Sequence, residues 1–403
     1  MIADVVLSKA CFGCGACEQK CPKDAIIMQP DEEGFLVPVV NASLCVECGL
    51  CRKVCQALHS KKYRKAEEGK HFIVQNRSSR KSKRSASGGA FIGMACYVLD
   101  YYNGVVFGCV MSEDNKVRHI KAENTTQLYA MQNSKYVQST IGQTYKEVAE
   151  YLSQKRVVLF SGTPCQVSGL YQYLQREDEN LITIDIICHG TPSPLLFHTY
   201  LDVIQKKYGK IKSLKFRYKN PYFKSISSFL LIVKFRNGKS IAQKPYENPY
   251  FNVFLNGWAF REVCYTCPYA QINRYGDFTI GDCDSHSLYP RFHPKESNST
   301  LMLNSQRAKR IWEEGLKDCF EFAPLDINKE ATRNKQLKAP FKRPDVRDVL
   351  YLDLKTLSFA DFSSKYSKHQ SMKSKVQLRM ALICPPVVFR IKAFLHKLLV
   401  NGK

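Results

Sequence analysis

The sequence predicts an α+β protein in which a small cysteine-rich module precedes a larger α/β body. Three observations support this fold class. The chain has 403 residues, more than one hydrophobic core usually contains, so it is long enough for several domains. Eight of its 17 cysteines lie in two sets before residue 60. Beyond residue 85, segments with helical spacing alternate with short apolar segments typical of buried parallel strands.

The composition is that of a folded protein, with 44% apolar and 24% charged residues. The first residues lack a basic segment followed by an apolar stretch and a cleavage site, so we expect a cytoplasmic location. The formal net charge of +24 suits an acidic partner protein such as a ferredoxin, an anionic small molecule or a membrane surface, and the charge does not rank them. The basic segments contain no interleaved stacking aromatics, which argues against nucleic-acid binding.

Both cysteine sets follow the spacing C-x2-C-x2-C-x3-C, which is typical of ferredoxin modules with two [4Fe-4S] clusters. Zinc has no use for the third and fourth cysteines at this spacing. In such modules the fourth cysteine of each set binds the cluster of the other set. One cluster is therefore predicted on Cys11, Cys14, Cys17 and Cys55, and the other on Cys45, Cys48, Cys51 and Cys21.

The segment between the two cysteine sets alternates and turns like a hairpin around residues 31–34. After the second set, Gln56 stands where the motif usually has proline. Proline shapes the turn after the ligand and does not bind iron, so we expect both clusters to form despite this difference.

The body begins with recognisable βαβ patterns. The predicted strands should be parallel, with right-handed crossovers. Ligands of parallel sheets collect at the carboxyl ends of strands, where Cys165 and Cys188 are expected. Helices are predicted over residues 90–102, 144–154 and 165–174, and strands over 104–110, 157–160 and 181–187.

Two glycine-containing turns, at residues 85–89 and 161–165, each precede a predicted helix. Free N–H groups there would suit a phosphate, although a plain tight turn explains the same residues. The spacing of the later cysteines leaves two metal sites open. These are a third cluster on Cys165, Cys188, Cys264 and Cys267, or a zinc site on Cys264, Cys267, Cys283 and His286.

Several ordered motifs resemble the coenzyme F-420 hydrogenase/dehydrogenase beta-subunit family over residues 1 to about 315. They are SGGAF from Ser87, SKYVQS from Ser134, LFSGTPCQVSGL from Leu159, DIICHGTPS from Asp185, and CYTCPYA from Cys264 followed by RYGDFTIGD. The family includes subunits that oxidise or reduce a deazaflavin and reductases acting on other substrates, such as a chlorophyll derivative. The resemblance implies FAD and one further [4Fe-4S] cluster, with Cys165, Cys188, Cys264 and Cys267 as ligands of that cluster.

The resemblance also implies which residues contact the flavin. Lys135 would place positive charge near flavin N1. His189 would donate a proton to flavin or substrate, or else hydrogen bond to a cluster sulfur. Arg274, Asp277 and Asp282 flank the last motif, where a structural ion pair is expected. The implied flavin contacts are Ser87, Gly88, Gly89, Lys135, Tyr136, Gln138, Ser161, Gly162 and Thr163.

The C-terminal segment is basic, and its last residues form an amphipathic pattern with apolar positions from Val387 to Leu399. Such a helix suits peripheral contact with the inner face of an anionic membrane, or packing on the protein's own core or on a partner. The predicted division is a ferredoxin domain over 1–60, a basic linker over 61–85, two body domains over 86–195 and 196–330, and a basic tail over 331–403.

Together these features predict an FAD-dependent iron-sulfur oxidoreductase acting on a small molecule that the sequence does not identify. Clusters carry single electrons and a flavin carries two, so the combination converts one kind of transfer into the other. The alternative is a non-catalytic electron-transfer subunit of a larger redox complex.

Overall fold

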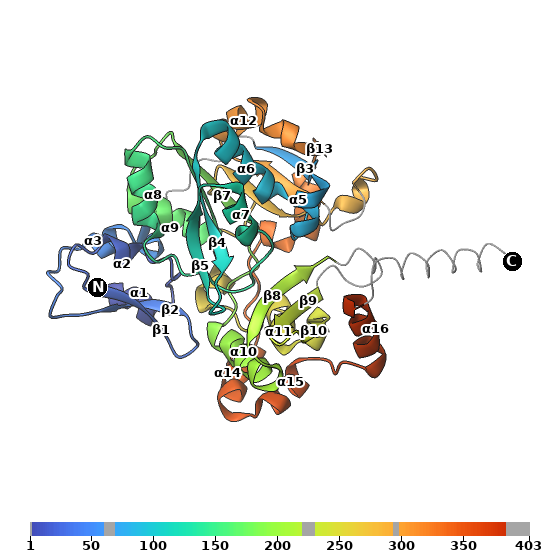
Figure 1. Cartoon of the computed structure of the whole chain (residues 1–403). Coiled ribbons are helices and arrows are strands. Elements are labelled where there is room, and N and C mark those ends of the chain that lie inside the picture. The colour runs from blue at the N-terminus through green and yellow to red at the C-terminus, as the bar shows by residue number, and fades with distance from the viewer. Residues whose placement is uncertain (1, 60–68, 220–229, 293–297, 384–403) are drawn as a thin grey trace, which may run out of the picture.

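The computed structural model describes residues 2–59, 69–219, 230–292 and 298–383. They form an N-terminal module, an eight-stranded sheet with helices on both faces, and a three-stranded sheet with its own helices (Figure 1). This mixture of helices and strands confirms the predicted α+β fold class.

The N-terminal module, residues 2–59, is built around an antiparallel hairpin that confirms the predicted turn at residues 31–34. Gly34 has φ +85°, and a Cβ there would lie 2.6 Å from the backbone nitrogen of Leu195, so the turn touches the body directly. The elements of the module are α1 (Ile2–Leu7), α2 (Ala16–Lys20), β1 (Ile26–Pro30), β2 (Leu36–Val40), α3 (Leu50–Lys53) and α4 (Gln56–His59).

The large sheet is mixed. Its four central strands, β4, β6, β7 and β11, are parallel, and the outer strands pair antiparallel. The carboxyl ends of the parallel strands therefore share one edge of the sheet. The strand order is β13 (Phe320–Pro324), β3 (Lys70–Asn76), β12 (Ser299–Leu303), β11 (Phe278–Asp282), β7 (Leu181–Ile186), β6 (Val158–Gly162), β4 (Val105–Met111) and β5 (Val117–Ala122).

Successive residues of the central strands pack on opposite faces of this sheet, as the two-residue period of a strand requires. Val106 belongs to the core beneath α6, α7 and α12, whereas Val105 and Phe107 belong to the core beneath α8 and α9. The predicted helices and strands between residues 90 and 187 are confirmed with small shifts of their ends. The helices of this part are α5 (Ser79–Arg84), α6 (Ala90–Tyr102), α7 (Thr125–Met131), α8 (Thr144–Ser153), α9 (Pro164–Leu174), α12 (Gln306–Glu313) and α13 (Ile327–Arg333).

The structure differs from the sequence expectation in the segment predicted as a linker. Residues 70–76 form β3, which lies between β12 and β13 inside the large sheet. Its apolar residues Ile73 and Val74 are fully buried. Basic residues on both sides of this short strand hide it in the sequence, because its partners lie more than 200 residues further along the chain.

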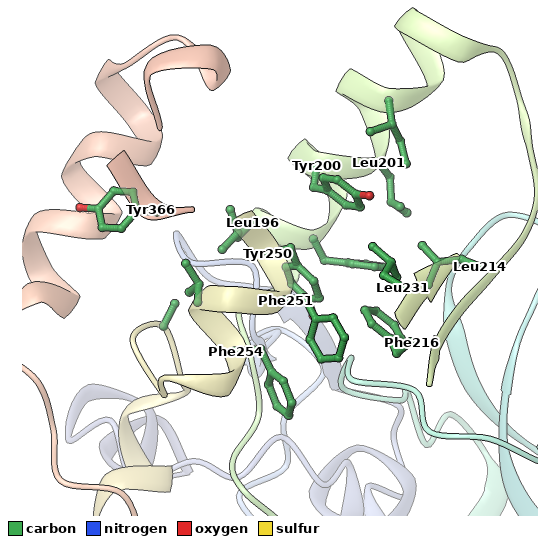
Figure 2. Packing of buried hydrophobic residues seen from close by; sticks show 14 of the residues in the cluster. Leu196, Tyr200, Leu201, Leu214, Phe216, Leu231, Tyr250, Phe251, Phe254 and Tyr366 are labelled. Carbon is green, nitrogen blue, oxygen red and sulfur yellow. The ribbon is translucent and has the colours of Figure 1, made fainter. Parts of the chain in front are cut away.

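The three-stranded sheet packs with four of its helices around an aromatic core, part of which Figure 2 shows. The fifth helix, α16, packs through Leu378 against Leu230 and Ile232, on the other face of this sheet. The expectation of a basic tail from residue 331 is wrong for residues 346–366, because Leu350, Tyr351, Phe362 and Tyr366 enter this core. The strands are β8 (Ile211–Tyr218), β9 (Leu230–Phe235) and β10 (Ser240–Gln243), and the helices are α10 (Pro194–Tyr208), α11 (Pro249–Leu255), α14 (Val346–Thr356), α15 (Phe359–Tyr366) and α16 (Met372–Ile383).

The predicted boundary at residue 195 also differs from the structure, because β11, β12 and β13 return to the large sheet after the small one. In the described part of the chain, no helix has both the length and the apolar character needed to cross a membrane. The predicted amphipathic segment from Val387 onward lies outside the described residues.

Candidate redox centre

The eight cysteines of the N-terminal module line two separate cavities, divided as the crossed ligand arrangement predicts. The first cavity is also lined by Phe12 and Val54, and one of its cysteines, Cys14, lies against Gly169 of the body. The second lies at the outer end of the module, where Cys48 is exposed. We call Cys11, Cys14, Cys17 and Cys55 the proximal thiols, and Cys21, Cys45, Cys48 and Cys51 the distal thiols.

The surroundings of these thiols fit iron-sulfur clusters. Burial raises the pKa of Cys14 to about 11 and that of Cys17 well above its usual value, so as thiols they would remain protonated. Iron ions compensate the charge of the thiolates that bind them. Backbone N–H groups already point at sulfur: Gly13 donates to Cys11 Sγ at 3.3 Å, and Ala25 donates to Cys21 Sγ at 3.3 Å.

The body brings a third group of four cysteines together. Cys165 lies in the first turn of α9, Cys188 follows β7, and the remaining pair lies in and just after the 3₁₀ turn Glu262–Thr266. The Cys165 thiol interacts electrostatically with the other three, and burial is the main cause that raises its pKa. Burial likewise raises the pKa of Cys188 to about 12. We call Cys165, Cys188, Cys264 and Cys267 the inner thiols.

Hydrogen bonds to the inner thiols come from neighbouring loops. Thr191 N–H donates to Cys264 Sγ at 3.4 Å, and Thr163 Oγ1 lies 3.1 Å from Cys165 Sγ. Four half-buried thiols gathered in this way, two of them with these polar partners, fit a further cluster in which each cysteine binds its own iron.

The zinc arrangement that the spacing allowed is not assembled. In the ranges that the structure describes, no three or more histidine, cysteine, aspartate or glutamate side chains are placed to bind a single metal ion. Cys283 instead lies in a separate core with Phe292 and Leu325, and its thiol faces Glu330 Oε2 at 3.7 Å. Glu330 also accepts hydrogen bonds from the backbone of Asp284 and Ser285, so it fixes the turn after β11.

The turn at residues 85–89 precedes α6 as predicted, and it is packed tightly against the sheet. A Cβ on Gly88 would lie 2.5 Å from the carbonyl oxygen of Val74, which explains the glycine. Ser87 and the Gly88 N–H both hydrogen bond to Ser299 Oγ, at 2.8 and 2.9 Å. Lys219 donates to the Ser87 carbonyl at 2.6 Å, which places a cation at this helix start.

The turn at residues 161–163 is engaged with its own helix. Thr163 and Gln166 form a capping box at the start of α9, in which the Thr163 N–H donates to Gln166 Oε1 at 3.0 Å. The Ser161 carbonyl accepts a hydrogen bond from His119 Nε2 at 2.9 Å. Gly162 lies against the Gln166 side chain.

Lys135, Tyr136 and Gln138 lie on one segment but point to different places. The Lys135 ammonium donates to the carbonyls of Ala130, Met131 and Gln132, so it caps the end of α7. The Tyr136 ring packs in the aromatic core, 4.4 Å from the Phe254 ring. Gln138 Nε2 donates to the carbonyl of Phe12 in the N-terminal module at 3.1 Å.

His189 has an exposed side chain between the rings of Phe254 and Phe341, with centroid distances of 6.4 and 6.0 Å. The surrounding protein partly removes the imidazole from water, which is the main cause that lowers the pKa of His189, and the negative charge of Asp282 opposes this effect. The imidazole is therefore mainly neutral near pH 7. Asp282 itself pairs with the buried Arg217 at 2.5 Å.

The expected structural ion pair involves Arg274, whose partner is a residue that the sequence did not single out. Arg274 pairs with Asp185 of β7 at 3.0 Å, and both side chains are buried. Asp277 accepts hydrogen bonds from Thr183 N and Oγ1, at 3.0 and 2.9 Å. These contacts fix the loop after Cys267 to the strand that leads to Cys188.

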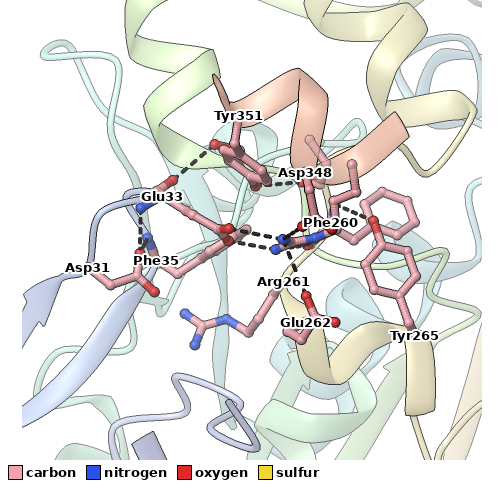
Figure 3. Close-up of polar contacts among 12 residues, drawn as sticks. Asp31, Glu33, Phe35, Phe260, Arg261, Glu262, Tyr265, Asp348 and Tyr351 are labelled. Atoms are coloured by element: carbon pink, nitrogen blue, oxygen red, sulfur yellow. Dashed lines mark hydrogen bonds and ion pairs between the residues drawn. The ribbon is translucent and has the colours of Figure 1, made fainter. Parts of the chain in front are cut away.

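Sequence reasoning missed a set of residues that join the module to the body. Arg261, 4% exposed, donates to the carbonyls of Cys11 and Leu36 at 3.0 and 2.9 Å and stacks over the Phe35 ring. Figure 3 shows Arg261 beside Phe35, with Glu33 and Tyr351 nearby. Arg347 of α14 makes a bidentate ion pair with Glu33. The sequence carried no sign of these long-range contacts.

Buried His119 gives a prediction for the pH dependence of stability. Burial lowers its pKa to about 4, while Ser139 and Ser161 occupy both ring nitrogens. Between about pH 6.5 and pH 4 the unfolded chain binds a proton that the folded chain does not. The free energy of unfolding should therefore fall by about 3 kcal/mol as the pH is lowered through this window.

This pH dependence can be measured by denaturant unfolding at several pH values. His119→Gln should flatten the curve between pH 6.5 and 4, because glutamine retains hydrogen-bonding groups but does not titrate. His59→Gln, at the exposed end of α4, serves as the control and should leave the curve unchanged. An unchanged curve in His119→Gln would contradict the prediction.

Comparison with family models gives matches in both the N-terminal module and the body. Residues 10–57 match the model of the 4Fe-4S dicluster domain, and residues 155–327 match the model for the C terminus of the coenzyme F420 hydrogenase/dehydrogenase beta subunit. The chain is thus an iron-sulfur redox protein whose N-terminal module is a two-cluster ferredoxin. It belongs to the F420 hydrogenase/dehydrogenase beta-subunit family, as its motifs predicted.

One solved structure with similarity to the chain comes from the xenon-derivatised F420-reducing [NiFe] hydrogenase complex of Methanosarcina barkeri. The two chains are 14% identical with a TM-score of 0.44, and the match covers 66% of this chain and 90% of the other. None of the curated proteins compared with the chain matches it significantly.

Proposed function

We propose that the chain is an FAD-dependent iron-sulfur oxidoreductase that exchanges electrons between its ferredoxin module and a small molecule, such as a deazaflavin coenzyme. The proposal is carried by the close approach of the proximal and inner thiols. Cys14 packs on Gly169 of α9, the helix that carries Cys165. The contact is so close that a Cβ on Gly169 would lie 2.9 Å from Cys14 Cβ and 3.2 Å from its sulfur. When bound, the clusters would supply single-electron transfer and the flavin two-electron chemistry.

The residues of the body have distinct tasks in this proposal. The inner thiols bind a third [4Fe-4S] cluster, and the turn from Ser87 to Gly89, with Lys219 beside it, receives the flavin pyrophosphate. Tyr136, Gln138 and the turn from Ser161 to Thr163 complete the flavin site. Lys135 contributes a positive charge that three carbonyls hold at the end of α7.

His189 is the proposed proton donor. Its imidazole is mainly neutral near pH 7, and an anionic group bound beside it would raise its pKa and thus load it with a proton. The two carboxylates that already act on its pKa, Asp282 and Asp284, favour the protonated form.

The outer end of the module is suited to a protein partner. The distal cavity lies at the surface, with exposed Leu44 and Val46 and exposed basic residues Lys23, Arg52 and Lys53 around it. An acidic redox protein, including another subunit of a larger complex, would match this surface.

The metal and flavin content tests the proposed function. Protein reconstituted anaerobically should contain about twelve irons and one flavin, because three four-iron clusters are expected. Cys165→Ser should reduce the content to about eight irons. Cys283→Ser, a matched change of a buried thiol outside the site, should leave it at about twelve.

Iron analysis and flavin absorbance after denaturation provide the measurement. A wild-type protein with about eight irons and no flavin would contradict the proposal. Loss of metal in Cys283→Ser would point back to the zinc arrangement.

A further inference from the structure

Gln56 is the one position where the second cysteine motif departs from its usual pattern, and the structure gives its side chain a specific place. Gln56 is the first residue of α4 and is 1% exposed. It follows the proximal ligand Cys55 directly. A buried amide needs partners for two N–H groups and one carbonyl oxygen, so its surroundings can be accounted for completely.

The partners of Gln56 belong to both thiol groups. Its Nε2 donates to the carbonyl of Cys165 at 2.7 Å, and the amide lies close enough to the Cys14 thiol to oppose the burial that raises the pKa of that thiol. Its Oε1 accepts from the Tyr269 hydroxyl at 2.6 Å. The amide therefore lies between a proximal thiol and the backbone of an inner cysteine.

Tyr269 strengthens the same connection from the other side. It follows Cys267 by two residues, and its hydroxyl is 2.8 Å from Ser168 Oγ on α9. Its ring packs edge-on against Phe12, between Cys11 and Cys14, with a centroid distance of 5.8 Å. Three segments thus converge on one buried amide.

We propose that Gln56 is a positioning residue that joins the proximal and inner thiols and, by donating a hydrogen bond to Cys14, raises the reduction potential of the proximal cluster. Hydrogen bonds to cluster sulfurs are among the factors that set the potential of such clusters. They favour the reduced form because it carries more negative charge. Proline, the usual residue of the motif, offers neither hydrogen bond. The role toward the inner cysteines rests on the function proposed above.

The distal site provides a matched control. Pro22 follows Cys21 as Gln56 follows Cys55, but it is exposed at the outer end of the module. A glutamine at residue 22 would face solvent. Pro22→Gln therefore changes the same motif position but does not create buried hydrogen bonds like those of Gln56. Proline is tolerated at the first position of a helix, so Gln56→Pro should preserve α4.

Redox titration monitored by electron paramagnetic resonance tests the proposal. In Gln56→Leu, the ratio of reduced to oxidised proximal cluster at a fixed potential should fall about tenfold, equivalent to a shift of about 59 mV for a one-electron couple. The other ferredoxin cluster should titrate as in the wild type. Pro22→Gln should leave both clusters unchanged.

The same titration in a Cys165→Ser background separates this proposal from the proposed function. That variant retains the backbone carbonyl that Gln56 contacts and leaves the two ferredoxin clusters to be observed. If the wild type contains only about eight irons, the proposed function fails. The shift in the reduction potential of the proximal cluster in Gln56→Leu would still decide the role of Gln56. Unshifted titrations in Gln56→Leu and Gln56→Pro, or an equal shift in Pro22→Gln, would overturn the proposal. If Gln56→Leu loses iron, Gln56→Pro supplies the deciding titration.

Discussion

Replacement of Arg347 by methionine should release the ferredoxin hairpin from the body. The Arg347 side chain is 1% exposed and donates to both Glu33 carboxylate oxygens at 2.9 and 2.6 Å. It also makes two hydrogen bonds to the Phe260 carbonyl, at 3.1 and 2.9 Å. Methionine fills similar space but offers no donor. Because charge-assisted hydrogen bonds in a buried setting are lost, we expect the contact to weaken by roughly 4 kcal/mol.

Hydrogen exchange at the hairpin turn is the appropriate measurement for Arg347→Met. Amides of residues 31–35 and 260–262 should exchange faster by more than about a hundredfold, whereas the centre of the large sheet should be unaffected. The side chain of Phe35, which enters the aromatic core from the turn, should become accessible to solvent at the same time.

Lys355→Met is the matched control for this substitution. Lys355 also projects from α14 to the same turn, where it pairs with Glu32 at 3.0 Å, but 49% and 88% of these two side chains are exposed. Exposed pairs contribute about 0 to 1 kcal/mol, so this variant should exchange like the wild type. Equal exchange in both variants would contradict the importance of Arg347.

The cysteine modules and the first βαβ units were predictable because their signals are local. Ligand spacing repeats within a few residues, and the helical period of residues 90–102 corresponds to α6 without a shift. The hairpin turn is likewise marked by Asp31 and Gly34 in the sequence. Such features depend on neighbours along the chain, so one sequence is sufficient to predict them.

The parts that were not predicted depend on contacts between distant segments. β3 is a short apolar segment among lysines, and its place in the sheet is fixed only by β12 and β13. In α14 and α15, charged residues are interspersed among the apolar residues that enter the core, so the segment resembled a tail. Burial of Leu350 and Phe362 becomes apparent only once the small sheet is present.

The junction between module and body was hidden for the same reason. Arg261 and Arg347 resemble surface arginines in a basic sequence, although both are buried at the interface. Gln56 was visible as a departure from the motif, but its bond to Cys165 spans 109 residues. The inner thiols were grouped by the family motifs, whereas the hydrogen bonds that surround them come from loops without a recognisable pattern.

Replacement of Arg274 by methionine should open the loop that carries the inner cysteines. Its partner Asp185 is completely buried and also accepts hydrogen bonds from the backbone N–H groups of Tyr275 and Gly276. The Arg274 guanidinium further donates to the carbonyls of Tyr269 and Ile186, at 2.7 and 2.8 Å. Removal of one partner from a buried ion pair costs roughly 3 to 5 kcal/mol, since the remaining charge is left uncompensated.

The loop should therefore exchange its amide hydrogens faster by at least about a hundredfold over residues 269–276 in Arg274→Met. The double variant Asp185→Asn/Arg274→Met should recover part of the loss, because it removes the unpaired charge. Arg236→Met is the surface control: its pair with Glu113 at 3.4 Å is exposed, with 59% and 94% of the side chains accessible. If Arg274→Met exchanges no faster than Arg236→Met, the buried pair does not hold the loop against β7, and the geometry of the inner thiols must depend on other contacts.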